Sequence, residues 1–454
     1  MAKNLTVGPP LRLITLFTLP ILIGNLFQQV YMVADTIVVG RLIGVQALAA
    51  VGVSGSLQFL LFGFAMGTCS GLAIPVARYF GAGDMAGMRR SVATGTLISL
   101  AVAIVITLVG TLGASTLLKL LGTPPELMED ATLFLVVFFA GTLATVAFNY
   151  LSAVIRALGD SRTPLYFLIV ASVLNVLLVI WFIGGLGMGV EGAALATVVS
   201  QFISVVLCVA LVWWRMPELH LRREDWKVDP AEMRVSAKLG LTMGFQISII
   251  GLGAALLQVG INGLGTQTVA AFTAAMRVDQ LAVVSPMSVG VAMTTYVAQN
   301  AGARKWRRVR VGVWRATLLA IGMAIVIGVI LFIWGTNLVE LFVGSGQDDV
   351  VALAHTYLVV NSALYSLLAI LFVIRNTIQG LGSTVAPTMA GVLELFARGL
   401  IGVFVVPLAG FIAVVLAAPI AWVAALIPLL GAWRFHHRRL VHSEQNDPTP
   451  GDDV

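Results

Sequence analysis

Long apolar segments alternate with short polar ones along almost the whole chain. Residues 97–118 and 316–339, for example, contain no Asp, Glu, Lys or Arg. Each is long enough to cross about 30 Å of hydrocarbon as a helix, which takes about 20 residues. A membrane β-barrel would instead show segments of about ten residues with alternating polarity, and the sequence has no such pattern. The pattern therefore predicts an all-α polytopic membrane protein.

Division of the sequence at glycines, prolines and charged clusters predicts twelve transmembrane helices. They cover residues 13–39, 47–77, 91–118, 128–153, 163–184, 190–214, 236–263, 269–297, 311–335, 350–374, 386–407 and 410–434. The longest polar connection separates the first six from the last six. We therefore expect a cytoplasmic N-terminal segment (1–12), a six-helix lobe (13–215), a cytoplasmic linker (216–235), a second six-helix lobe (236–437) and a disordered cytoplasmic tail (438–454).

The two halves of the chain repeat each other at a spacing of about 221 residues. The pattern Leu-Gly-x4-Pro, for example, occurs at residues 158–164 and again at 381–387. Because six helices separate the two copies, both lobes should have the same topology and lie parallel. Paired lobes of this kind are typical of transporters whose substrate site lies between them.

Composition and charge agree with a membrane location. Of the 454 residues, 59% are hydrophobic and only 11% are charged, against about 25% in a soluble domain. Lys and Arg concentrate at the two ends and in the connections after even-numbered helices, so the positive-inside rule places both termini in the cytoplasm. The net charge of +6 then reflects contact with anionic lipid rather than with nucleic acid. We expect a multi-pass protein of the inner or plasma membrane.

One carboxylate lies within the first predicted helix. An aspartate inside a membrane span costs about 2.5–3.5 kcal/mol on insertion scales, so a functional role of Asp35 would explain its presence there. Gln28 and Tyr31 precede it by seven and four residues and share its helix face. We interpret this polar stripe as an ion-coupling site in which Asp35 takes up and releases a proton. The alternative is a structural aspartate at the headgroups, since Gly40 follows only five residues later.

The second half contains two charged pairs within predicted helices. Arg277 and Asp279 lie in the eighth helix, and Glu394 and Arg398 are four residues apart in the eleventh. Glu before Arg at this spacing is the favourable order on one helix face. Such groups either line a polar substrate cavity or have a purely structural role, and the sequence leaves both open.

Motifs for catalysis and cofactor binding are missing from the sequence. There is no G-x-x-x-x-G-K-[ST] phosphate loop, no H-E-x-x-H zinc motif and no Ser/His/Asp arrangement. We therefore expect neither an enzyme nor a bound cofactor or metal, apart from a transported coupling ion.

Five segments together resemble the multidrug and toxic compound extrusion (MATE) family. They are 33–40 (VADTIVVG), 81–90 (GA and RR), 156–164 (RALGDSRTP), 189–197 (GVEGAALAT) and 375–382 (RNTIQGLG). The resemblance implies a secondary antiporter that exports amphipathic, often cationic drugs in exchange for inward H⁺ or Na⁺, by alternating access of the two lobes.

The same resemblance implies roles for particular residues. It makes Asp35 the coupling-ion residue of the first lobe, with Asn175 and Thr197 in the same site. Many members have a second aspartate four residues after the asparagine, where this chain has Val179. Because Na⁺ prefers several hard oxygen ligands, this difference favours H⁺.

Other functions stay open at this stage. A flippase of lipid-linked oligosaccharides would have more helices and a strongly basic cavity, and a metabolite exporter could have the same architecture. A membrane enzyme would need a catalytic constellation, and a scaffold would not need Asp35. The expected partners are small-molecule drugs and the lipid bilayer, with the chain acting as a monomer.

Overall fold

A computed structural model describes residues 4–227, 229–344 and 346–446, except for the side chains of residues 34, 36 and 45. All regular elements within these ranges are helices. Ten of them are long and apolar enough to cross a membrane, and two further pairs of shorter helices are bent by 48° and 52°. If each bent pair forms one span, the described residues contain twelve. The predicted all-α membrane fold is confirmed.

The helices group into two compact units. Among the described residues, unit 1 consists of Asn4 and Ile23–Ser248, and unit 2 of Leu5–Leu22 together with the chain from Ile249 onward. The boundaries therefore fall inside α1 (Pro10–Leu42) and α8 (Pro230–Asn262), rather than at the polar connections predicted from the sequence. The polar linker marks where the chain leaves its apolar segments, whereas the units are defined by which helices pack together.

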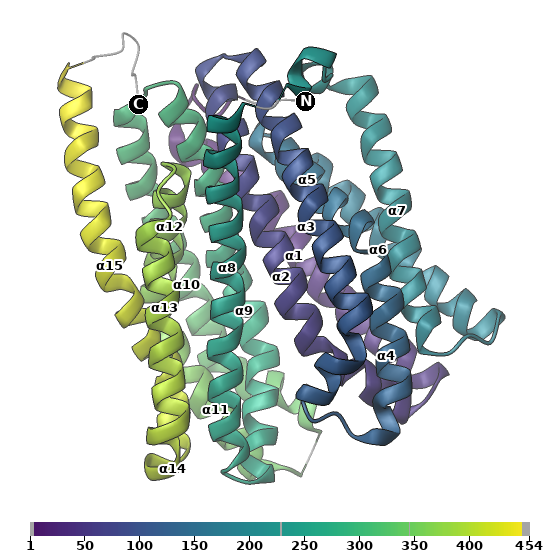
Figure 1. The fold of residues 1–454 in the computed structure, drawn as a ribbon. Helices are drawn as coiled ribbons and strands as arrows, with labels where there is room; N and C mark the ends of the chain where they lie inside the picture. Colours follow the sequence, from purple (N-terminus) through teal and green to yellow (C-terminus); the bar gives the residue numbers. More distant parts are fainter. Residues whose placement is uncertain (1–3, 228, 345, 447–454) are drawn as a thin grey trace. The chain divides into compact units, whose positions relative to one another are not determined.

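Unit 1 contains the second part of α1, the first part of α8 and all helices between them (Figure 1). Its α2 packs against α3, α4 and α5, and its α7 packs against α4, α5 and α6. The helices are α2 (Val45–Ala82), α3 (Met85–Leu120), α4 (Pro125–Ala140), α5 (Thr142–Ala157), α6 (Arg162–Val179), the π-helical η1 (Ile180–Gly185) and α7 (Val190–Arg215).

Unit 2 repeats this order of elements, including a bent helix pair followed by a helix that ends in a π-helical turn. Its α9 packs against α10, α11 and α12 and contributes much of the hydrophobic core. The helices are α9 (Thr266–Gly302), α10 (Trp306–Val343), α11 (Asp348–Ala363), α12 (Tyr365–Gly380), α13 (Val385–Leu400), the π-helical η4 (Ile401–Val405), α14 (Val406–Ala409) and α15 (Phe411–Asn446).

A row of glycines on α2 lets the first part of α8 approach closely within unit 1. A Cβ atom on Gly67 would lie 2.5 Å from the carbonyl oxygen of Met243, and one on Gly71 would lie 2.6 Å from that of Leu239. Only glycine permits such backbone contact, as in other membrane helix pairs with small residues four apart.

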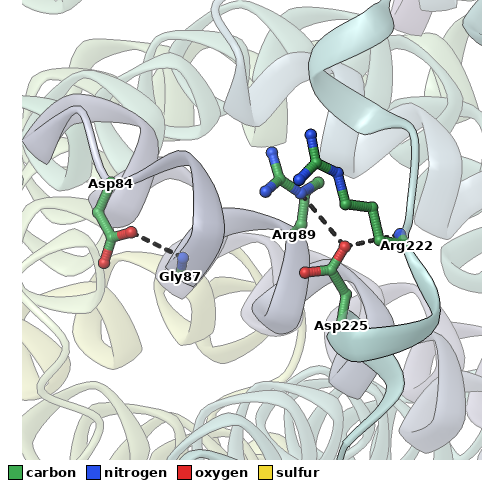
Figure 2. Close-up of polar contacts among 5 residues, drawn as sticks. All are labelled: Asp84, Gly87, Arg89, Arg222 and Asp225. Carbon is green, nitrogen blue, oxygen red and sulfur yellow. Dashed lines mark hydrogen bonds and ion pairs between the residues drawn. The ribbon is translucent and has the colours of Figure 1, made fainter.

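The predicted linker is held against α3 rather than free in solution. It forms two short 3₁₀ turns, η2 (Pro217–Leu219) and η3 (Arg223–Trp226). The carboxylate of Asp225, 7% exposed, accepts hydrogen bonds from Arg89 Nε on α3 at 3.2 Å and from the backbone N–H of Arg222 at 2.7 Å (Figure 2). The same view shows Asp84 capping the start of α3 through the N–H of Gly87 at 2.8 Å.

Both ends of the described chain are attached to unit 2. Near the N-terminus, Arg308 donates to the carbonyl oxygen of Gly8 at 2.7 Å, and Gln299 accepts from the N–H of Leu5 at 2.9 Å. At the other end, α15 continues to Asn446, and Glu444 forms an ion pair with Arg310 at 2.8 Å. The prediction of a disordered tail was therefore wrong for residues 438–446. Residues 1–3 and 447–454 lie outside the described part.

Candidate functional site

The predicted ion-coupling residues of unit 1 come from α1, α6 and α7. Because α6 packs along α7, Asn175 Nδ2 donates to Thr197 Oγ1 at 3.0 Å. The side chain of Tyr31 on α1 lies near Thr197 and interacts electrostatically with Asp35, one helical turn further on. The structure thus brings Asp35, Tyr31, Asn175 and Thr197 into one group, which we call the unit 1 cluster.

Local sequence features position these side chains. At Gly24, α1 lies against α6: a Cβ atom there would be in ordinary contact with Leu165 and Leu168, at 3.5 Å. At the start of α6, Asp160 accepts hydrogen bonds from the N–H and the hydroxyl of Thr163, at 3.1 and 2.7 Å. Burial opposes ionisation of Asp160, whereas the hydrogen bonds that its carboxylate accepts from Thr163 favour the charged form. The charged carboxylate therefore fixes the first turn of α6.

Two oxygens of the unit 1 cluster lack a hydrogen-bond donor. Asp35 Oδ1 and Asn175 Oδ1 are buried, and neither accepts a hydrogen bond from the described residues. A buried acceptor without a donor costs about 1–3 kcal/mol, and most such groups in proteins are satisfied. A proton on Asp35 or a small cation would supply what is missing. Gln28 is half-buried on the same helix and, within the described part of the chain, has no hydrogen bond to the other four residues.

A second polar group lies inside unit 2, on α9, α12 and α13. The carboxylate of Asp279, 8% exposed, accepts a hydrogen bond from Tyr365 Oη at 2.5 Å and interacts electrostatically with Arg398. Glu394 forms a buried ion pair with Arg375 on α12, in which both side chains are less than a tenth exposed. We call these five residues the unit 2 cluster.

The unit 2 cluster differs from the arrangement suggested by the spacing of its residues. Glu394 pairs with Arg375 rather than with Arg398, because the neighbouring helix presents a guanidinium to it. Arg277 is exposed while Asp279 is buried, since residues two apart on a helix point to different sides. Arg277 is therefore separate from the buried network.

Two members of the unit 2 cluster were not among the predicted site residues. Arg375 lies one residue beyond the predicted tenth span and was interpreted only as part of the resemblance. An arginine that directly follows the apolar run 367–374 is a signal visible in the sequence. Tyr365 gave none, because a single tyrosine in an apolar helix is ordinary.

The sequence profile described as MatE matches residues 20–181 and 243–405, once in each half of the chain. The chain belongs to the MatE family. The two matches begin 223 residues apart, in agreement with the internal repeat. Members of this family are transporters rather than enzymes, so the chain is a multi-pass membrane transporter.

Curated relatives cover most of the chain. "Probable multidrug resistance protein YpnP" of Bacillus subtilis is 29% identical over 388 residues, 84% of this chain and 85% of the relative. A NorM protein of Bradyrhizobium diazoefficiens, also named a multidrug resistance protein, is 25% identical over 91% of this chain and 86% of its own length. An FAD transporter of Shewanella oneidensis is 23% identical over 83% of each chain.

Solved structures share the fold. An outward-facing multidrug resistance MATE family transporter of the MOP superfamily matches with a TM-score of 0.89 at 23% identity, over 97% of this chain and 99% of that one. A MATE transporter in a bent conformation matches with a TM-score of 0.87 at 24% identity, over 98% of both chains.

Proposed function

We propose that this transporter is a secondary antiporter that exports amphipathic, often cationic drugs in exchange for inward H⁺, by alternating access of its two lobes. The names of the multidrug resistance relatives support the cargo class. The observation that supports the coupling is a pair of buried oxygens, Asp35 Oδ1 and Asn175 Oδ1, that accept no hydrogen bond from the part of the chain that the structure describes. In the same proposal the chain is a monomer in the cell membrane with both termini in the cytoplasm.

Asp35 can link ion and cargo because its two protonation states need different surroundings. Ionised, its buried oxygen lacks a donor; protonated, the carboxyl gains a donor of its own and loses its charge. Coupling requires only that ion and cargo favour different conformations of the protein. A difference of about 5.5 kcal/mol inverts a population from 1:99 to 99:1, and the membrane cost of one charged side chain is a sizeable part of that.

H⁺ is favoured over Na⁺ by the ligands that surround Asp35. The unit 1 cluster offers one carboxylate, and α6 position 179, one helical turn after Asn175, is a fully buried valine rather than a second acid. Na⁺ is a hard cation that needs several oxygen ligands at once. A proton needs only one acceptor.

Transport in proteoliposomes tests both the coupling and the ion. The purified protein is reconstituted, and uptake of a fluorescent cationic dye is followed with either a pH gradient or a Na⁺ gradient imposed alone. We expect the pH gradient to drive dye accumulation and the Na⁺ gradient at clamped pH to drive none. Accumulation under Na⁺ alone would reassign the ion, and accumulation under neither gradient would refute coupled antiport.

An anionic metabolite is the second candidate cargo. It is favoured by the FAD transporter among the relatives and by the exposed Arg277 on α9, a side chain able to bind phosphate. Adding FAD to the dye assay separates the two candidates. If FAD inhibits dye uptake and other cationic dyes inhibit it little, the metabolite is the favoured cargo. If other cationic dyes inhibit uptake and FAD does not, drugs are the favoured cargo. A lipid-linked oligosaccharide flippase has no specific support in the structure.

A further inference from the structure

The charges of the unit 2 cluster balance one another. Glu394 is paired with Arg375, which leaves Arg398 as the counter-charge of Asp279. Three elements present polar or charged groups to this carboxylate: Tyr357 from α11, Tyr365 from α12 and Arg398 from α13. Of these groups only Arg398 carries a positive charge, so the neutrality of the site depends on it.

Arg398 is held in place by packing as well as by charge. A Cβ atom on Gly253 would lie 3.6 Å from Arg398 Cδ, which places the stem of this side chain against the unit 2 part of α8. Arg398 Nε is buried and has no hydrogen-bond partner among the described residues. Arg398 acts on Asp279 through its charge, and the two side chains form no direct ion pair among the described residues. The guanidinium is therefore a nearby fixed charge that is incompletely satisfied by hydrogen bonds.

In the internal repeat, the position of Arg398 in the second half corresponds to that of Asn175 in the first half. Asn175 and Arg398 each lie eleven residues after a proline in the first turn of their helices, Pro164 in α6 and Pro387 in α13. Both helices continue into a π-helical turn. At this shared position unit 1 carries an amide with a free oxygen, whereas unit 2 carries a permanent positive charge.

We propose that Arg398 is a tethered cation that occupies the charge position of a coupling ion in unit 2, so that removing its guanidinium opens a second cation site at Asp279. The proposal deepens the proposed function, since it assigns ion exchange to unit 1 alone. Without Arg398, Asp279 would be a buried carboxylate with only tyrosine hydroxyls around it, and Glu394 would still be bound to Arg375. Such a carboxylate takes up a proton or a small cation.

Infrared difference spectroscopy on the purified full-length protein tests this without any transport step. Spectra across a pH titration are compared for the wild type, Arg398→Gln and Arg398→Gln/Asp279→Asn. Arg315→Gln, which removes a positive charge from α10 of the same unit, is the matched control. We expect Arg398→Gln to gain one protonated-carboxyl band at neutral pH that is absent from the other three proteins.

The outcomes separate the alternatives. Suppression of the new band by Na⁺ would show that the opened site also accepts a metal cation and would support the proposal. No new band, or a band that persists in the double variant, would overturn it. Because the spectra do not depend on dye movement, failure of antiport in proteoliposomes leaves this result unaffected.

Thermal unfolding provides a second readout if Arg398→Gln folds poorly. When two charges neutralise each other, each single substitution leaves the other charge buried and unpaired. We therefore expect Asp279→Asn and Arg398→Gln each to lower the Tm by several degrees, and the double variant to lose clearly less than the sum of the two. Additive losses would show that the two side chains do not act as a pair.

Discussion

The polar clusters of the two units differ in how the charge of a buried carboxylate is compensated. In the unit 1 cluster one carboxylate, Asp35, lies near an amide and hydroxyls, and two of the cluster's oxygens have no donor among the described residues. In unit 2 two carboxylates are accompanied by two arginines. Under the proposed function, charge balance rather than the presence of an acid distinguishes the cluster that exchanges a cation from the one that does not.

Because of this difference in charge compensation, we expect substitutions in the unit 1 cluster to affect transport and substitutions in the unit 2 cluster to affect folding stability. An acid without a fixed counter-charge has a protonation state that follows its surroundings, so its loss should change transport more than folding. A buried pair of opposite charges is neutral as long as both groups stay ionised, so the loss of one member should change folding first. The predictions below test this division.

The largest effect is expected from Asp35→Asn. The substitution keeps the shape of the side chain but fixes it in a neutral form, so that no proton can be exchanged. Accumulation of dye driven by a pH gradient in proteoliposomes should fall to the background level, while the Tm stays close to that of the wild type. Glu129→Gln, an exposed carboxylate on α4, is the control and should transport normally. Undiminished uphill transport by Asp35→Asn would move the coupling away from unit 1.

Asp35 also shows what the sequence alone could provide. A charge in an apolar run is costly, so its position could be recognised without a structure, and its helix neighbour Tyr31 followed from periodicity. The helical spans were found in the same way, because hydrophobic segment length is fixed by the bilayer. Both features depend only on residues within one helix, so they can be read from the sequence alone.

The next largest effect is expected from Glu394→Gln, which leaves Arg375 buried without its counter-charge. Removing one partner of a buried ion pair typically costs about 3–5 kcal/mol. The measurement is thermal unfolding in detergent. The double variant Glu394→Gln/Arg375→Met should recover a large part of the loss, because it leaves neither charge behind. An unchanged Tm in the single variant would mean that the pair is not buried as described.

The partner of Glu394 could not be predicted, because it depends on how helices pack. Residues four apart share a face, which favoured Arg398, but the facing helix supplied Arg375. The bend between α4 and α5 has a similar origin. It falls at Gly141, where a Cβ atom would lie 2.1 Å from the side chain of Val198 on α7. Contacts between distant parts of the chain leave no local pattern in the sequence.

A smaller effect is expected from Tyr365→Phe, which removes the hydroxyl that donates to Asp279. A hydrogen bond to a charged group contributes about 1.5–3 kcal/mol, so the Tm should fall less than in Glu394→Gln. Since Arg398 still neutralises the carboxylate, dye transport driven by a pH gradient should persist. Loss of transport with an unchanged Tm would place Asp279 in the coupling mechanism and break the division between the two units.

The smallest effect is expected from Thr197→Val in unit 1. Valine keeps the shape but removes the oxygen that accepts from Asn175 Nδ2 and contacts Tyr31, and Asp35 itself is left unchanged. Loss of one neutral hydrogen bond is worth about 1 kcal/mol, which corresponds to about fivefold in ion affinity. The concentration of H⁺ needed for half-maximal dye transport, measured at a series of pH values, should change by about that factor, with little change in Tm. A loss of transport as complete as in Asp35→Asn would show that the hydroxyl is itself an indispensable ion ligand, which is the requirement of a metal cation rather than of a proton.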